Sequence, residues 1–289
     1  MAKSIISIME YVVRPATRKE LEVMIEWAAK EGWNPGLHDG DALYSIDNKG
    51  FLLGFLDGKP IASISAVAYN DNFGFIGFYI AKPEHRSKGY GYKIWNAAMK
   101  YLSTQNVALD GVVAQQENYK KSGFKLAHRH IRYEGHGSDE KLKEDLHLKP
   151  LSKIDINSIY KYDKKIFLFD RKSFLNLWIQ QPASLAIGYI RDKKLMGYGM
   201  VRKCRSGYKV GPLFADSKEI AKTLFERMRA FVGKDGLIYL DVPEPNKKAM
   251  ALAKEYNMKP MFETARMYTK EIPKAPLHKV FGVTTFEVG

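Results

Sequence analysis

The sequence predicts a duplicated α/β fold, in which two halves each combine a mixed sheet with flanking helices. Three observations support this prediction: the chain length, the alternation of strand-type and helix-type segments, and the repetition of that order. At 289 residues the chain is long enough for two domains of about 140 residues each. Hydrophobic residues make up 45% and charged residues 27%, which is ordinary for a globular protein.

The first half begins with a helix, because Thr17 and Glu20 have the spacing of a capping box ahead of an amphipathic segment. Asp57-Gly58 is a hairpin signal between the first two strands. The strands are predicted at 51–56, 61–69, 73–80, 107–113 and 124–133. The later helices are predicted at 92–102 and 117–122.

The second half repeats this order after a charged, weakly apolar segment at 136–150, which we expect to link domains at 1–135 and 151–289. Its predicted elements are a helix capped by Asp170 with Phe174, Leu175, Trp178 and Ile179 on one face, strands at 184–190 and 195–202, a helix at 217–232, a strand at 237–242, a helix at 246–256 and a strand at 261–270. Gly123 precedes Arg132 by the same spacing as Asn257 precedes Arg266. Asn commonly replaces Gly in the left-handed stop of a helix, so we expect equivalent geometry in both halves.

A glycine-bearing basic turn, Arg86-Ser-Lys-Gly89-Tyr-Gly91, lies between the strand at 73–80 and the helix at 92–102. A strand–turn–helix of this kind directs free backbone N–H groups and the positive end of a helix dipole to one point, which favours phosphate. Gly89 and Gly91 let the backbone approach an anion closely, while Arg86 and Lys88 add positive charge.

This turn resembles the acyl-CoA signature of the GNAT acyltransferase superfamily, an Arg or Gln followed by x-x-Gly-x-Gly or Ala. Tyr119-Lys-Lys-Ser-Gly-Phe124 resembles the Tyr-x-x-x-Gly-Phe helix of the same superfamily. Segments 31–36, 77–80, 109–112 and 266–268 resemble a bacterial two-domain GNAT group with a divergent C-terminal half. The resemblance implies a twisted, mostly antiparallel mixed sheet flanked by helices in each domain, with acetyl-CoA as co-substrate. The residues it places against that co-substrate are Tyr79, Ile80, Ala81, Arg86, Ser87, Lys88, Gly89, Tyr90, Gly91 and Tyr92.

The resemblance also assigns catalytic roles. Tyr119 is expected to act as the general acid beside the sulfur of CoA, because acyl transfer expels a thiolate. Backbone N–H groups near residues 79–81 would form an oxyanion hole where the strand splays from its neighbour. The family commonly places a basic carboxylate on a neighbouring strand, but the strand at 73–80 contains no acid, so the general base stays open.

The candidates for that base are Asp39, Asp41, Asp110, His128 and His130. For three of these residues a structural role is favoured over a catalytic one: Asp39 as an exposed loop acid, Asp110 as a hydrogen-bonded structural acid and His128 as a packed imidazole. We expect Asp39 to contact the acceptor ammonium, next to Trp33 and Asn34 in the loop that borders the acceptor pocket.

The second half lacks the glycine signature. Before its long helix stand Pro212, which has no N–H, and the bulky Leu213 and Phe214, so we expect no CoA diphosphate there. Cys204 has no evident base beside it and is expected to be a bystander, which favours direct attack in a ternary complex. No His or Cys spacing suggests a metal site.

The net charge of +14 is spread over dispersed lysines, which fits a solvated surface and attraction of an anionic cofactor better than nucleic-acid binding. The single cysteine suits a reducing cytoplasm, and no apolar stretch approaches the roughly 20 residues that a membrane span needs. The expected function is transfer of an acetyl group to a primary amine, with a small molecule as the expected acceptor. The alternative is a non-catalytic acyl-CoA-binding sensor or interaction module. The acceptor and the oligomeric state stay open, a homodimer included.

Overall fold

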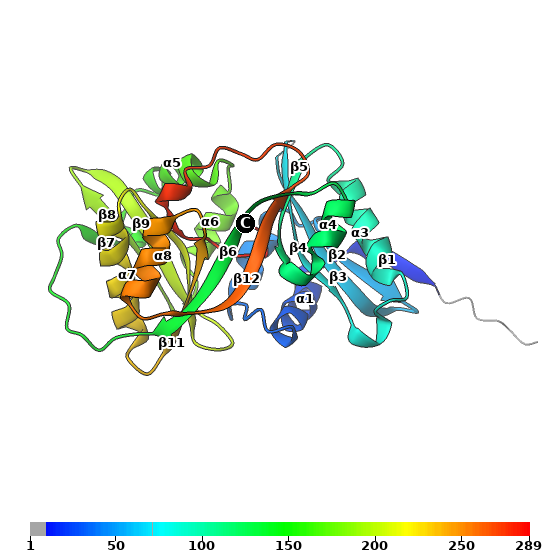
Figure 1. Cartoon of the computed structure of the whole chain (residues 1–289), viewed down its shortest axis with the longest axis horizontal. Helices are drawn as coiled ribbons and strands as arrows, with labels where there is room; N and C mark the ends of the chain where they lie inside the picture. The colour runs from blue at the N-terminus through cyan, green and yellow to red at the C-terminus, as the bar shows by residue number, and fades with distance from the viewer. Residues whose placement is uncertain (1–9, 71) are drawn as a thin grey trace, which may run out of the picture.

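The computed structural model describes residues 10–70 and 72–289, and within them thirteen strands form one sheet (Figure 1). The strands are β1 (Tyr11–Pro15), β2 (Phe51–Leu56), β3 (Lys59–Asn70), β4 (Phe73–Ala81), β5 (Asn106–Val112), β6 (Lys125–His136), β7 (Leu148–Pro150), β8 (Ser184–Arg191), β9 (Lys194–Lys203), β10 (Tyr208–Ala215), β11 (Leu237–Pro243), β12 (Lys259–Tyr268) and β13 (Val280–Gly282). The helices are α1 (Arg18–Lys30), α2 (Asp39–Tyr44), α3 (Tyr90–Tyr101), α4 (Gln116–Lys121), α5 (Ile156–Phe167), α6 (Lys172–Trp178), α7 (Lys218–Val232) and α8 (Lys247–Glu255).

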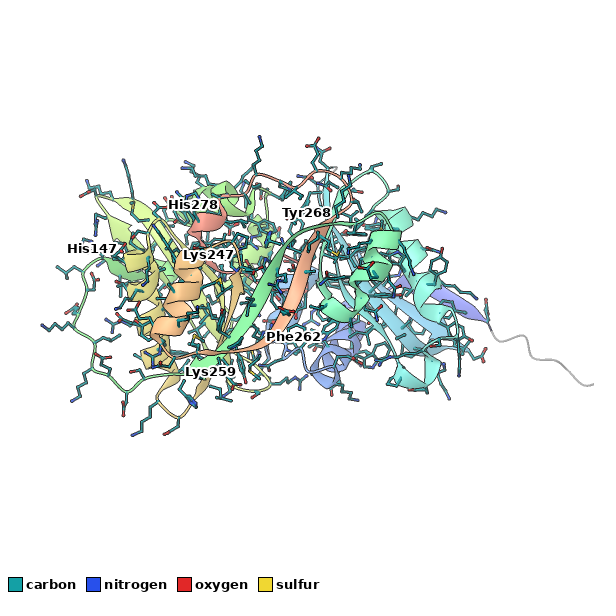
Figure 2. All side chains as sticks on the ribbon, viewed as in Figure 1. His147, Lys247, Lys259, Phe262, Tyr268 and His278 are labelled. Carbon is teal, nitrogen blue, oxygen red and sulfur yellow. The ribbon has the colours of Figure 1, made fainter. Side chains whose placement is uncertain are left out.

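The two halves exchange their last long strands and thereby share this sheet. The strand order is β1-β2-β3-β4-β5-β12-β6-β11-β10-β9-β8-β7, and β13 pairs with β10. The second half therefore contributes β12 to the sheet of the first half, where it lies between β5 and β6, while β6 pairs with β11. Figure 1 shows β6 and β12 crossing the middle of the molecule, and Figure 2 marks the course of β12 by Lys259, Phe262 and Tyr268.

An equivalent buried ion pair lies at each exchanged strand. Arg266 on β12 stands opposite Asp110 on β5 and donates two hydrogen bonds of 2.7 Å to its carboxylate. Arg132 on β6 stands opposite Asp241 on β11 and donates two of 2.6 and 2.7 Å. The predicted equivalence of the halves is confirmed by this pairing.

The helix before each exchanged strand ends at a residue in the left-handed backbone conformation, as predicted. Gly123 has φ of 88° and Asn257 has φ of 54°. Asn tolerates this conformation because its short polar side chain bonds locally, whereas most side chains clash with the backbone there.

Helices cover both faces of the sheet. In the first half, α1 and α2 pack with α6 on one face, and α3 packs on the other through Ile94, Trp95 and Ala98. In the second half, α7 and α8 form one core and α5 the opposite one. None of the helices in the described ranges is long and apolar enough to cross a membrane.

Several elements differ from the sequence-based expectations, and strands β1, β7 and β13 and helix α2 were not predicted. The cap of α6 is Arg171, one residue later than predicted, although the Asp170 carboxylate still accepts a hydrogen bond from the Lys172 amide at 3.2 Å. Helix α5 was not expected, although Asp155 caps it by accepting bonds from the amides of Asn157 and Ser158. The segment before the long helix of the second half is strand β10, which was not predicted.

Candidate active site

A cavity of about 670 Å³ opens beside β4 and extends to the junction of the halves. Its walls come from α1 and the loop after it, β4, the 86–92 turn, β5, α4, β6, β12 and the segment around residue 286. Of the residues expected at the site, those that line the cavity are Trp33, Tyr79, Ile80, Ala81, Arg86, Ser87, Gly89, Gly91, Tyr92 and Tyr119. Asn34, Asp39, Lys88 and Tyr90 lie outside the lining.

The cavity exists because β4 and β5 separate. Their parallel pairing ends where Ile76 meets Leu109, and the register of β4 on β3 then shifts around Phe78. Phe78 has a positive φ of 47°, and the Ser63 hydroxyl donates a 2.8 Å hydrogen bond to its carbonyl. Such a bulge bends a strand away from its neighbour, so the far half of β4 has a free edge that faces the cavity.

The 86–92 turn presents backbone amides to the cavity. Within the described residues, the backbone N–H groups of residues 87–92 donate no hydrogen bond to a protein acceptor. Gly89 caps α3 with φ of 82°, and a Cβ at Gly91 would lie 3.1 Å from the Tyr79 hydroxyl oxygen. Uncapped amides at a helix N-terminus attract an anion, since both the N–H groups and the dipole favour negative charge.

The two basic side chains of the turn are partly committed to protein contacts. The Arg86 guanidinium donates to the Ala81 carbonyl at 2.9 Å and pairs with Glu31 at 2.5 Å. The Lys88 ammonium donates to the Glu84 carbonyl at 2.8 Å. These contacts organise the turn, so the anion-binding capacity rests mainly on the backbone.

Tyr119 reaches the cavity from α4. Its ring stacks on Trp95 with centroids 5.6 Å apart and packs against Gly111, where a Cβ would collide with it. Burial, and then the nearby Tyr79 hydroxyl, raise the pKa of Tyr119 far above that of a free phenol. The hydroxyl therefore keeps its proton at neutral pH, as a proton donor must.

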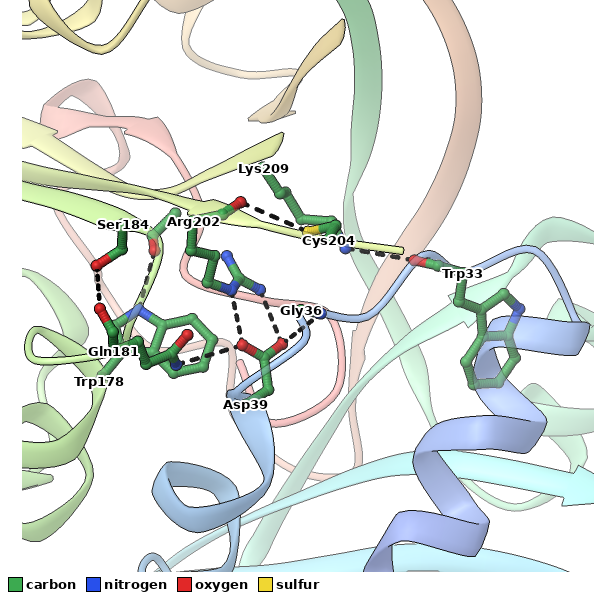
Figure 3. Close-up of polar contacts among 10 residues, drawn as sticks. Trp33, Gly36, Asp39, Trp178, Gln181, Ser184, Arg202, Cys204 and Lys209 are labelled. Atoms are coloured by element: carbon green, nitrogen blue, oxygen red, sulfur yellow. Dashed lines mark hydrogen bonds and ion pairs between the residues drawn. The ribbon is translucent and has the colours of Figure 1, made fainter. Parts of the chain in front are cut away.

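The expectation that Asp39 is an exposed loop acid is wrong. Asp39 is 3% exposed and accepts bonds of 2.8 and 3.2 Å from Arg202, 2.8 Å from the Gly36 amide and 3.3 Å from Gln181 (Figure 3). Burial alone would raise the pKa of Asp39, but Arg202 and the Gly36 amide hold it below its usual value. Asp39 therefore attaches the first half to the second and is not proposed as an acceptor contact.

The neighbouring loop is attached to the second half as well. The Asn34 side chain both donates to the Ser206 carbonyl at 2.8 Å and accepts from its amide at 2.9 Å. The Trp33 carbonyl accepts from Arg132 at 3.0 Å and from Lys209 at 3.3 Å. This loop thus borders the cavity mainly through Trp33.

The other candidate bases are held in a structural network. Asp110 accepts both bonds from Arg266 and lies 3.3 Å from His130, whose second ring nitrogen lies 2.9 Å from His128. Burial would raise the pKa of Asp110, but Arg266 and His130 hold it well below its usual value. Burial lowers the pKa of His128 to about 3. A carboxylate locked in this way is a weak base, as expected for a satisfied structural acid.

The end of the cavity at the junction of the halves contains residues that sequence reasoning missed. They are Arg132, Phe262, Thr264, Phe286 and Glu287. The Arg132 guanidinium lies 5.1 Å from the ring centre of Phe286 and 5.8 Å from that of Phe262. No local motif marks these residues, because β6, β12 and the last segment meet only in the folded chain.

The equivalent opening in the second half is filled. The parallel pairing of β10 with β11 ends where Val210 meets Leu240, in the way that β4 and β5 separate. Beyond that point β13 pairs antiparallel with β10, and the Val283 amide donates to the Asp241 carbonyl on β11 at 2.9 Å. The protein's own chain therefore occupies the space that remains open in the first half.

Comparisons with known proteins agree with this architecture. A model of the acetyltransferase (GNAT) family matches residues 13–124, and one of the acetyltransferase (GNAT) domain matches residues 159–282. Holothin acyltransferase of Pseudoalteromonas sp. (strain SANK 73390) is 29% identical over 276 residues, 96% of this chain and 94% of that protein. The uncharacterized N-acetyltransferase YitH of Bacillus subtilis (strain 168) is 28% identical over 172 residues, 58% of this chain and 60% of that protein.

Solved structures share the fold over the whole length. A putative acetyltransferase from Pyrococcus horikoshii superposes with a TM-score of 0.83 at 22% identity, covering 100% of this chain and 99% of that one. A tandem GNAT protein from the clavulanic acid biosynthesis pathway superposes with a TM-score of 0.62 at 11% identity, covering 92% of this chain and 100% of that one. The chain therefore belongs to the GNAT acyltransferases and carries two GNAT domains in tandem.

Proposed function

We propose that the protein transfers an acetyl group from acetyl-CoA to a primary amine by direct attack in a ternary complex. The observation that carries this proposal is that Ser87, Gly89, Gly91 and Tyr92, whose amides are uncapped, line the same cavity as Tyr119 and the free edge of β4. The turn would hold the diphosphate of CoA, and the free edge of β4 near residues 79–81 would stabilise the oxyanion. Tyr119 would protonate the departing thiolate.

A covalent acyl-cysteine route has little support. Cys204 is 1% exposed, and burial raises the pKa of its thiol despite the nearby Arg202. A buried thiol that keeps its proton is a poor nucleophile. Direct attack by the amine remains the simpler route.

The two halves take unequal roles in this proposal. We assign CoA binding and chemistry to residues 1–135, a linker to 136–150 and a degenerate partner domain to 151–289. The β13 pairing supports an inactive second half, since it fills the opening where a CoA arm would enter. The similarity to holothin acyltransferase extends over both halves, which supports a small-molecule acceptor by analogy with that protein's name.

The test is CoA release from acetyl-CoA, followed with a thiol reagent, in the presence of tyramine, tryptamine, putrescine, glucosamine or glycine. Gly89→Glu should abolish release and weaken CoA binding in calorimetry, because it places a negative charge among the phosphate-binding amides. Gly58→Glu is the matched control, since Gly58 has φ of 75°, and a Cβ at either position meets nothing within 4 Å. Equal release by Gly89→Glu and the control would contradict the assigned site, and wild-type CoA binding without release from any amine would contradict catalysis.

A further inference from the structure

The segment 283–289 is buried at the junction and reaches the end of the cavity that Arg132 and Phe262 line. The Ser65 hydroxyl donates to the Glu287 carbonyl at 3.3 Å, and the Tyr69 hydroxyl donates to the Val288 carbonyl at 2.6 Å. The backbone of Glu287 lies directly over Gly77, where a Cβ would come within 2.1 Å of its carbonyl oxygen. These contacts fix the segment against β3 and β4, the strands that border the proposed oxyanion site.

Three acidic residues line the cavity, and the carboxylates of two of them are committed to strong partners. Glu31 pairs with Arg86 at 2.5 Å, and Asp110 is held by Arg266 and His130. Glu287 is 4% exposed, and among the described residues its carboxylate has no ion pair within 4.0 Å and no side-chain hydrogen bond. By elimination, Glu287 is the cavity carboxylate with free lone pairs.

Three basic side chains are charged neighbours of Glu287: Arg132 on β6, Arg202 on β9 and Lys209 on β10. Arg132 is neutralised by Asp241, and Arg202 by Asp39. Lys209 is buried, and among the described residues its ammonium donates one hydrogen bond, to the Trp33 carbonyl at 3.3 Å. Lys209 is thus a buried cation near Glu287 with no carboxylate within 4.0 Å in the described part of the chain.

We propose that Glu287 is the general base of the acyl transfer, an assignment that rests on the proposed function. The Glu287 carboxylate takes one proton from the acceptor ammonium and frees the nitrogen lone pair. That pair forms the C–N bond to the thioester carbonyl, and the tetrahedral oxyanion collapses with cleavage of the C–S bond. Tyr119 protonates the thiolate and regains its proton from the second N–H of the nitrogen, while the proton on Glu287 leaves to solvent. The products are the amide, CoA thiol and one proton.

This assignment explains why β4 needs no acid of its own. The carboxylate comes instead from Glu287, which lies 222 residues after Ser65 in the sequence. The Ser65 hydroxyl donates a hydrogen bond to the backbone carbonyl of Glu287. Phe286, the residue before it, contributes an aromatic wall, so one short segment would supply both the base and part of the acceptor surface.

The test is the pH dependence of kcat/KM for acetyl-CoA with the best amine of the panel. Glu287→Gln should lower kcat/KM at pH 7 by roughly 10²–10⁴-fold, the usual contribution of a general base. Its rate should then rise about tenfold per pH unit toward the pKa of the amine, because only the free amine can react. Glu287→Asp should recover part of the activity, and CoA affinity measured by calorimetry should stay unchanged in both variants.

Glu271→Gln is the matched control, since it makes the same change at an exposed position outside the cavity. A Glu287→Gln enzyme with the rate and pH profile of this control would overturn the assignment and leave the proposed function intact. A loss of rate without the change in pH dependence would also overturn it, because that outcome indicates a structural role. Absence of CoA release by the wild type with every amine would refute the proposed function, and the assignment with it.

Discussion

Gly77→Ala provides a direct test of how the 283–289 segment is held. The new Cβ would lie 2.1 Å from the Glu287 carbonyl oxygen, whereas ordinary contacts begin at 3.4 Å. The obstructing atom belongs to the backbone, so the segment itself must move by about 1.3 Å, from 2.1 to 3.4 Å. The hydrogen bonds from Ser65 and Tyr69 would then be strained or lost, which costs roughly 2 kcal/mol at about 1 kcal/mol per bond.

The functional effect should exceed the loss of stability. A displacement of about 1 Å at a reacting group costs on the order of 10²-fold in rate, so Gly77→Ala should be nearly inactive while still folded. Gly74→Ala is the matched control on the same strand, because its Cβ would meet only the flexible end of Leu102. Hydrogen–deuterium exchange should show faster exchange at 283–289 in Gly77→Ala alone. Equal exchange and equal activity in the two variants would refute the docking of this segment on β4.

Three further outcomes follow from the same structure. Tyr119→Phe should lower kcat by roughly 10²-fold or more with CoA affinity unchanged in calorimetry, and an unchanged kcat would remove the general-acid role. Asp241→Asn should cost about 3–5 kcal/mol in urea unfolding because it leaves Arg132 buried and unpaired, whereas replacing both by Leu and Met should restore most of the loss. Burial would raise the pKa of Asp241, but Arg132 lowers it in the folded protein. Asp241 therefore stabilises the fold fully above the ordinary carboxyl pKa, and this stabilisation is lost as the pH falls below about 4. The free energy of unfolding should accordingly be lower at pH 3 than at pH 7, and this difference should be smaller in Asp241→Asn. Cys204 should react with a thiol reagent far more slowly in the native protein than in urea, since burial raises its pKa, and equal rates would contradict its burial.

Local patterns predicted those parts of the fold that depend on neighbours in the chain. The capping box at Thr17 is present with both of its bonds, and Gly123 and Asn257 adopt the left-handed conformation. The strand–turn–helix around Gly89 is also where the motif placed it. The missed helix α5 carried a usable signal, since Asp155 caps it and its buried residues recur on one face.

Contacts between distant segments could not be predicted in this way. An alternating strand pattern indicates which face of the strand is buried, but not which strand pairs with it. The exchange of β6 and β12 therefore has no signal in the local sequence. The burial of Asp39 depends on Arg202, 163 residues later in the sequence. Glu287 stands in a short apolar segment that carries no motif, and its position in the cavity depends on the packing of both halves.

Only one of the two equivalent openings remains a cavity in the described structure, because the segment 280–289 contacts the two halves differently. β13 fills the opening between β10 and β11, and the residues that follow form a wall of the cavity beside β4. Figure 1 accordingly marks the C-terminus at the centre of the molecule, beside β6 and β12.

This arrangement also predicts that the halves cannot be separated. Residues 1–135 alone would lose β12 from between β5 and β6 and β11 from the other edge of β6, which exposes unpaired strand edges and leaves Asp110 and Arg132 buried without partners. We expect this fragment to aggregate, and co-expression with residues 136–289 to return a soluble complex of native size in sedimentation. A monomeric 1–135 fragment that binds CoA as tightly as the full chain would contradict this, and would mean that the first half can close its own sheet by pairing β5 with β6.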